Sequence, residues 1–224
     1  MKVLFKSTLI LGFIALAIGC TKEPPVMTFN VTPSATDVFA GTAIDYTITG
    51  EADFITFYAG TPGSEWSEYP DNKGQNVNVR TSNVFSKVYN KQGVFTSVFV
   101  ASSYGNWAED EEVVIKEFEI TVTDNRTGIA DFRLITGSLL TQKEWPGEIN
   151  TDNNTIVVEV DPGTSISNTK ASLITDSPDA IVTVDGAEFI NSKTRLNYTS
   201  PVIFDIEAPD GSKGQWTVTV TGAK

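Results

Sequence analysis

Hydrophobic and polar residues alternate along most of this 224-residue chain with a period of two. Ile44, Tyr46 and Ile48, for example, alternate with polar neighbours. A period of two is typical of a β-strand with one buried face. After Cys20, no stretch of ten or more residues shows the i, i+3, i+4 spacing of an amphipathic helix. The pattern therefore predicts an all-β protein.

The first half of the chain contains seven candidate strands. The strands at residues 53–59 and 94–101 are apolar on both faces, which favours central positions in a sheet. Thr32-Pro33-Ser34 is expected to end the first strand. The seven candidates are residues 27–31, 44–48, 53–59, 77–80, 84–89, 94–101 and 114–122.

The second half repeats this pattern after a polar, turn-forming segment. Ala130, Phe132 and Leu134 are expected to share a buried face. Asp185-Gly186 is a hairpin-type turn signal. The candidate strands are residues 130–134, 156–160, 171–175, 181–184, 202–206 and 216–220.

Strands of this length with turn signals between them are typical of antiparallel sandwiches. We therefore predict two tandem immunoglobulin-like antiparallel β-sandwiches, at residues 26–124 and 129–224, with a linker at residues 125–128. A chain of this length is long enough for two such domains.

The N-terminus has the organisation of a secretory signal. Lys2 and Lys6 precede an apolar run at residues 7–18, which is too short to span a bilayer. Leu16-Ala17-Ile18-Gly19-Cys20 resembles the lipobox of bacterial lipoproteins, in which the signal is removed and the cysteine is acylated. The resemblance implies a signal peptide at residues 1–19, a lipidated tether at residues 20–25 and fatty acyl chains such as palmitate on Cys20. The alternatives are a buried thiol and an ordinary signal peptide that ends near a cysteine.

Charge and composition exclude several functions. The 28 acidic residues outnumber the 16 basic ones, and the resulting negative charge works against binding to nucleic acid or to anionic membrane surfaces. The chain has no histidine, which excludes Ser-His-Asp and Cys-His catalysis and histidine-based zinc sites. There is no glycine-rich phosphate loop. We expect no enzyme activity, no cofactor and no metal, although a carboxylate pair for glycoside hydrolysis stays open.

The alternative to a metal-free protein is Ca²⁺ binding at one of two acidic clusters. Glu109-Asp110-Glu111-Glu112 and the group of Glu148, Asp152 and Asn153 carry the oxygen ligands that Ca²⁺ prefers. Neither cluster has the spacing of a known calcium loop, and acidic runs are more often solvated faces.

Aromatic residues in predicted loops are the candidates for ligand binding. Sugar faces are partly apolar and stack on exposed rings, while polar neighbours bind the hydroxyls. We select Trp66, Tyr104 and Trp107 as candidate contacts. The alternative is that such loop rings, Tyr69 and Trp145 included, close the open ends of the sandwiches. Trp216 is in phase with a predicted strand and is expected in the core.

Several motifs resemble one group of proteins, the surface lipoproteins of Bacteroidetes. The first half resembles their N-terminal PKD-like, immunoglobulin-type domain, and the second half is similar to a C-terminal domain frequent in them. Cys20-Thr21-Lys22-Glu23 is similar to the charged tag that directs such lipoproteins to the cell exterior. The remaining motifs are Asp53-Phe54-Ile55-Thr56-Phe57-Tyr58-Ala59-Gly60, Gly63-Ser64-Glu65 and residues 118–124 in the first half, and Phe132 with Leu134, Glu148-Ile149, Asn154-Thr155-Ile156, Asp161-Pro162-Gly163-Thr164, Asp210-Gly211-Ser212 and residues 216–220 in the second.

The resemblance implies a non-catalytic lipoprotein, anchored to outer-membrane lipid through acylated Cys20 and facing the cell exterior. It would bind glycan or serve as an accessory component of a polysaccharide-uptake system, with polysaccharide or outer-membrane transporter proteins as partners. The alternative is a structural or adhesive spacer that contacts proteins and binds no sugar.

Overall fold

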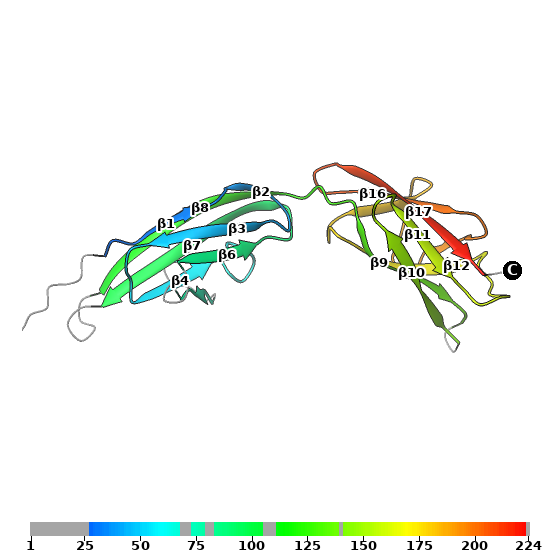
Figure 1. Cartoon of the computed structure of the whole chain (residues 1–224), viewed down its shortest axis with the longest axis horizontal. Helices are drawn as coiled ribbons and strands as arrows, with labels where there is room; N and C mark the ends of the chain where they lie inside the picture. Colours follow the sequence, from blue (N-terminus) through cyan, green and yellow to red (C-terminus); the bar gives the residue numbers. More distant parts are fainter. Residues whose placement is uncertain (1–26, 68–72, 79–82, 105–110, 139–140, 223–224) are drawn as a thin grey trace, which may run out of the picture. The chain divides into compact units, whose positions relative to one another are not determined.

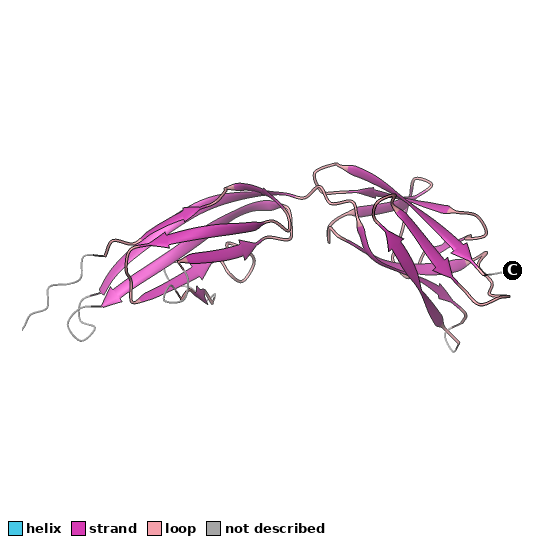
Figure 2. Ribbon diagram, viewed as in Figure 1, coloured by secondary structure: helices cyan, strands magenta, loops and turns pink. Residues whose placement is uncertain are grey.

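The computed structural model describes residues 27–67, 73–78, 83–104, 111–138 and 141–222, and within these ranges it contains strands and no helix (Figure 1, Figure 2). The all-β prediction is therefore confirmed. The strands are β1 (Asn30–Pro33), β2 (Asp37–Phe39), β3 (Ala43–Thr49), β4 (Phe54–Tyr58), β5 (Gln75–Asn76), β6 (Val84–Val88), β7 (Gly93–Tyr104), β8 (Glu111–Thr123), β9 (Ile129–Thr136), β10 (Lys143–Asn150), β11 (Thr155–Glu159), β12 (Thr169–Thr175), β13 (Ile181–Val184), β14 (Ala187–Glu188), β15 (Arg195–Leu196), β16 (Val202–Glu207) and β17 (Lys213–Thr221).

The chain divides into two compact units. Unit 1 is formed by residues 1–34, 45–85 and 96–118, and unit 2 by residues 35–44, 86–95 and 119–224. Between β8 and β9 the chain has no strand over residues 124–128. The predicted linker at residues 125–128 lies in that segment, and its role as a domain boundary stays a prediction.

Two sheets contribute to the core of unit 1. One has the strand order β1-β3-β6 and the other the order β2-β8-β7-β4-β5. Tyr46 of β3 is fully buried, and its ring lies 5.0 Å from Phe99 of β7 and 5.8 Å from Phe57 of β4, measured between ring centroids. Phe85 of β6 lies 4.7 Å from Phe57. Aromatic rings from both sheets thus pack together, as in a sandwich.

Unit 2 contains a sheet with the order β14-β13-β16-β17-β11-β10-β9-β12-β15. Strand β10 connects its two parts, because Lys143–Pro146 pairs with β9 whereas Gly147–Asn150 pairs with β11. A side chain at Gly147 would place its Cβ 2.5 Å from Ile156 and 3.2 Å from Phe132. Glycine therefore allows β10 to pass closely over the core. Buried residues of that core include Phe132, Leu134, Ile156, Val158, Ala171, Phe204, Trp216 and Val218.

The structure corrects four details of the predicted strands. Two pairs, β2 with β8 and β11 with β17, are parallel rather than antiparallel. Pro33 extends β1 and pairs with Tyr46 instead of ending the strand. Ala130 is exposed and Ile129 is buried, because the register between β9 and β12 shifts there. Val77 lies just after β5 rather than opening a strand.

Candidate functional site

The structure describes only part of the predicted set of functional residues. Cys20 and Trp107 lie outside the described residues, as do Tyr69 and the first two acids of the 109–112 cluster. Trp66 is half-buried in the segment between β4 and β5. Tyr104 is the last residue of β7 and is 37 % exposed. Trp66 is not among the described residues that line the pocket beside Tyr104, so its contribution to binding stays a prediction.

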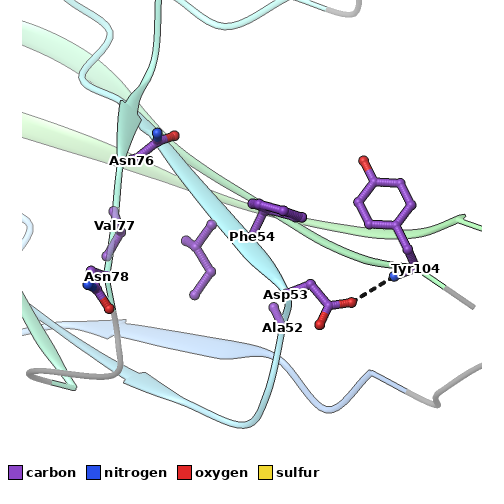
Figure 3. Close-up of a pocket in the computed structure, with 8 residues that line it drawn as sticks. Ala52, Asp53, Phe54, Asn76, Val77, Asn78 and Tyr104 are labelled. Carbon is purple, nitrogen blue, oxygen red and sulfur yellow. Dashed lines mark hydrogen bonds between the residues drawn. The ribbon is translucent and has the colours of Figure 1, made fainter. Parts of the chain in front are cut away.

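A pocket of about 540 Å³ lies beside Tyr104 within unit 1 (Figure 3). It is lined by Ala52, Asp53, Phe54, Ile55, Asn76, Val77, Asn78 and Tyr104. They lie at the start of β4 and just before it, at the end of β5 and just after it, and at the end of β7. The pocket thus combines two aromatic rings with a carboxylate and two amide side chains, which together offer hydrogen-bond donors and acceptors.

Phe54 and Tyr104 form the aromatic part of this pocket. Their ring centroids are 5.9 Å apart and the ring planes meet at 73°, an edge-to-face arrangement. Phe54 pairs with Ser102 across β4 and β7, which makes Tyr104 its diagonal neighbour two residues further along β7. Phe54 is 64 % exposed, the largest exposed fraction among the described large hydrophobic residues. Both rings are therefore held in place by the sheet and remain accessible.

Polar contacts fix Tyr104 at both ends. Its backbone N–H donates to the Asp53 carboxylate at 2.9 Å (Figure 3), and its hydroxyl donates to the Glu111 carboxylate of β8, also at 2.9 Å. The hydrogen bond to Glu111 raises the pKa of the Tyr104 hydroxyl, because the neutral hydroxyl is the donor beside a carboxylate. Asp53 is anchored in turn, since its N–H donates to the Ser102 carbonyl at 3.0 Å. The pocket is therefore organised before any ligand binds.

Two of the remaining tryptophans have structural roles. Trp216 is 2 % exposed, which confirms its predicted place in the core, and its indole N–H donates to the Thr127 carbonyl at 2.9 Å. Trp145 of β10 packs against the core of unit 2, and its indole N–H donates to Thr136 at 2.8 Å. The Nζ atom of Lys143 lies 3.6 Å from the centroid of the Trp145 ring. For Trp145 the structure therefore favours the packing role that was left open.

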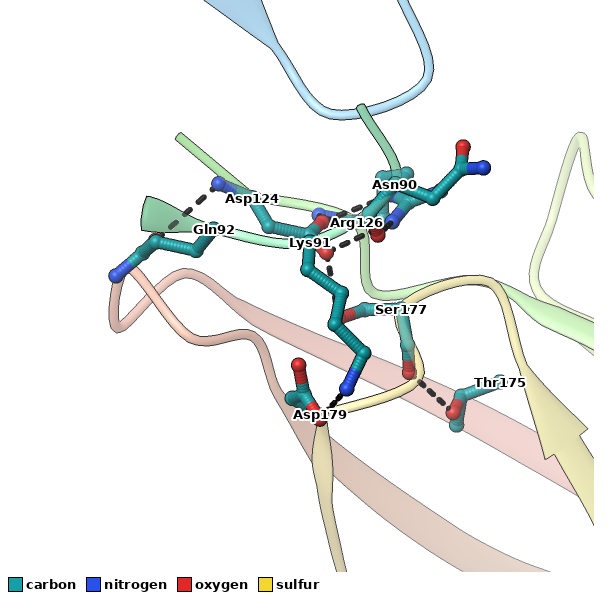
Figure 4. A network of polar contacts seen from close by, with 8 residues as sticks. All are labelled: Asn90, Lys91, Gln92, Asp124, Arg126, Thr175, Ser177 and Asp179. Carbon is teal, nitrogen blue, oxygen red and sulfur yellow. Dashed lines mark hydrogen bonds and ion pairs between the residues drawn. The ribbon is translucent and has the colours of Figure 1, made fainter. Parts of the chain in front are cut away.

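A second polar cluster surrounds Asp124 in unit 2 (Figure 4). The Asp124 side chain is 1 % exposed and accepts hydrogen bonds from Arg126 Nε and Nη2, both at 2.8 Å. Ser177 Oγ donates to the same carboxylate at 2.8 Å, and the Asp124 N–H donates to the Gln92 side chain at 3.2 Å. The hydrogen bonds from Arg126 hold the pKa of Asp124 below its usual range. Both oxygens of the buried carboxylate accept hydrogen bonds, which indicates a structural role for this cluster.

Among the described residues, no group of three or more acidic or cysteine side chains is arranged to hold a metal ion. Glu148, Asp152 and Asn153 belong to this part of the chain, whereas Glu109 and Asp110 do not. In the same described ranges no helix is long and apolar enough to cross a membrane.

The sequence reasoning missed four polar or aromatic residues that line the pocket: Asp53, Phe54, Asn76 and Asn78. The stretch at residues 53–59 is apolar on both faces, which predicted a central strand but not which face is covered. The available signal was Asp53 at the start of that strand, because a carboxylate beside an aromatic ring marks the end of a buried segment. Asn76 and Asn78 carry no such signal.

One family model matches part of the chain. A family model described as "SGBP, N-terminal" matches residues 135–220, which lie in the second half of the chain. That half had been compared with a C-terminal domain, so the matched family differs in its described position. Residues 135–220 are thus similar to the N-terminal domains of starch- or glycan-binding proteins.

Two solved structures show a weak likeness. One is a secreted protein from Bacteroides fragilis, 20 % identical, which covers 45 % of this chain and 98 % of its own with a TM-score of 0.34. The other is murine CEACAM1b, 8 % identical, which covers 86 % of this chain and 99 % of its own with a TM-score of 0.27. Neither TM-score is high enough to support an argument about function. The comparison with curated proteins gave no match.

Proposed function

We propose that this chain is a non-catalytic surface lipoprotein that binds glycan in the pocket lined by Phe54 and Tyr104. The exposed edge-to-face ring pair beside Asp53, Asn76 and Asn78 is the observation that carries the proposal. The match of residues 135–220 to a family of glycan-binding proteins supports the general class. Anchoring to the outer membrane through acylated Cys20, on the outer side of the cell, is part of the same proposal.

The chemistry of the pocket fits a sugar. The face of a pyranose ring presents C–H groups that pack on Phe54 or Tyr104, while its hydroxyls need hydrogen-bonding partners at the rim. Asp53, Asn76 and Asn78 supply such groups. The pocket of about 540 Å³ is within the range of about 300–1,000 Å³ that is common for small-ligand sites.

Affinity gel electrophoresis tests this proposal. The soluble fragment that begins at Thr21 is run in gels that contain one polysaccharide each, drawn from a panel of neutral and charged glycans. We expect retardation on at least one glycan, and loss of that retardation in Phe54→Ala and Tyr104→Ala. Phe39→Ala is the matched control, because Phe39 is a 55 % exposed phenylalanine on β2 that does not line the pocket. Incubation of the fragment with the same glycans in solution is expected to release no reducing sugar.

One observation favours a second function. Val113 and Ile115 of β8 are 46 % and 40 % exposed, so the apolar surface continues beyond the pocket on the neighbouring strand. Such a surface suits contact with a protein partner. A wild-type fragment that is retarded by none of the glycans would contradict glycan binding and favour the structural or adhesive spacer.

A further inference from the structure

Negative charge dominates the described lining of the pocket. Asp53 is the charged residue among the described lining residues, and the remaining members are apolar or carry amide or hydroxyl groups. Glu111 adds a second carboxylate, 2.9 Å from the Tyr104 hydroxyl. Two carboxylates therefore flank one aromatic pair, and no lysine or arginine is present in the described lining.

The two aromatic rings also favour a positively charged ligand. The face of an aromatic ring carries negative partial charge and attracts ammonium groups within about 6 Å of its centroid. Phe54 is 64 % exposed and Tyr104 is 37 % exposed, so a ligand can reach both rings. Carboxylates and ring faces thus attract the same kind of group, a protonated amine, and both disfavour an anionic group.

We infer that this pocket selects cationic glycans, those whose sugars carry free amino groups, over neutral glycans and against uronic-acid glycans. The inference rests on the proposed glycan-binding function and names the chemical class of its ligand. It follows from the placement of Asp53 and Glu111 beside the Phe54–Tyr104 pair.

The size of the expected preference follows from the distance between the charges and from the dielectric constant of water. Two unit charges about 4 Å apart in water interact by about 1 kcal/mol, which corresponds to about fivefold in Kd. The pocket is open to water, so the high-dielectric value applies. We therefore expect at least about fivefold tighter binding of a glycan with one ammonium group near these carboxylates than of its neutral counterpart.

Isothermal titration calorimetry at low salt tests the inference with three tetrasaccharides. The tetramer of β-1,4-linked glucosamine and cellotetraose differ only in an amine or hydroxyl at carbon 2, and tetragalacturonate supplies the anionic case. We expect the glucosamine tetramer to bind most tightly and tetragalacturonate most weakly. The preference is expected to collapse at about 1 M salt, where the Debye length falls to about 3 Å.

The local origin of the preference is tested with two double variants of equal charge. Asp53→Asn with Glu111→Gln removes the lining carboxylate and the carboxylate bound to the Tyr104 hydroxyl, while keeping an acceptor oxygen for each contact to Tyr104. Glu117→Gln with Glu119→Gln removes two exposed carboxylates further along β8. We expect the first double variant to lose the preference for the glucosamine tetramer and the second to keep it.

Three results would overturn the inference. They are equal binding of the amine and hydroxyl tetramers, a preference that survives in both double variants, and no binding of any of the three tetramers. The failure of the proposed function is a different observation, namely no retardation on any polysaccharide in the gel panel. Retardation on a neutral polysaccharide without a cationic preference leaves glycan binding intact and removes only the charge selectivity.

Discussion

The guanidinium of Arg126 holds the buried carboxylate of Asp124 through two N–H donors, each 2.8 Å from a carboxylate oxygen. Ser177 Oγ donates a third hydrogen bond to this carboxylate at 2.8 Å. These contacts stabilise the charged form and lower the pKa of Asp124. The folded state is therefore linked to the ionisation of this carboxyl.

Asp124→Asn is expected to lower the free energy of unfolding at neutral pH by about 2 kcal/mol, the typical value of hydrogen bonds to a buried charge. A lowered pKa in the folded state means that the stabilisation is present above the unfolded carboxyl pKa of about 3.9 and is lost as pH falls through the folded-state value. The difference between wild type and variant should therefore shrink below about pH 4. Urea denaturation at several pH values measures it.

Asp179→Asn is the matched control for this prediction. Asp179 is exposed, and its ion pair with Lys91 at 2.9 Å is a surface contact. Surface pairs contribute about 0–1 kcal/mol, so this variant should change stability little at any pH. A loss in Asp124→Asn that is equally large at pH 3 and pH 7 would contradict the role of the charged carboxyl.

Tyr198→Phe is expected to leave the stability unchanged or to raise it by about 1 kcal/mol. Tyr198 is 1 % exposed, and its hydroxyl has no hydrogen-bond partner among the described residues. Burial of this hydroxyl without a hydrogen bond destabilises the folded state, and phenylalanine removes the hydroxyl. Chemical denaturation measures the change, with Tyr46→Phe as the control, because the Tyr46 hydroxyl is hydrogen-bonded to Ser97 at 2.9 Å and its removal should destabilise.

The same tyrosine is expected to affect stability in alkali. Burial raises the pKa of Tyr198 above its ordinary value. Above about pH 10 the unfolded tyrosine ionises while the folded one keeps its proton, so stability falls as pH rises toward the folded-state pKa. Tyr198→Phe should lose less stability than wild type between about pH 9 and pH 11. An identical alkaline loss in both proteins would contradict this.

Gly147→Ala is expected to destabilise unit 2 by about 1–3 kcal/mol, the usual cost of overpacking. The new Cβ would lie 2.5 Å from Ile156 Cγ2 and 3.2 Å from Phe132 Cδ1, both in the core. Glu148→Ala is the control, because Glu148 is the next residue of β10 and is exposed. Thermal and urea denaturation compare the two variants, and equal stability of both would show that β10 can shift to accept a side chain.

The strands that the sequence predicted well bury one face along their whole length. Ile44, Tyr46 and Ile48 of β3 are 0–3 % exposed, and the inward residues of β16 behave in the same way. Strand β10 was missed because it pairs with β9 over its first half and with β11 over its second, and it contains Pro146 and Gly147. Neither feature produces a regular alternation, so only the contacts of the folded chain define this strand.

The candidate site was only partly predictable for a related reason. Tyr104 was selected because it lies in a predicted loop, although the structure places it at the end of β7. Phe54 was missed because it lies in a strand that is apolar on both faces. Alternation indicates that the two faces differ but not which one a second sheet covers. The register that places Phe54 opposite Ser102 and diagonal to Tyr104 is a long-range property of the fold.

Cys20→Ser is expected to move the protein from the membrane fraction to the soluble fraction. Cys20 is the single cysteine of the chain, so a palmitate label found in the wild type and absent from the variant can be assigned to it. One acyl chain alone binds membranes only marginally, and stable anchoring needs more than one. Intact-mass analysis of the wild type should therefore show several acyl chains on a mature N-terminus at Cys20.

Thr21→Ser is the matched control for the anchor, because it introduces the same residue type at the next position without removing the thiol. It should stay in the membrane fraction and keep the label. A wild-type protein with a free thiol, or with its mature N-terminus at another residue, would contradict lipidation. The proposed glycan pocket is lined by residues 52–55, 76–78 and 104, so binding by the soluble fragment tests that site independently of the anchor.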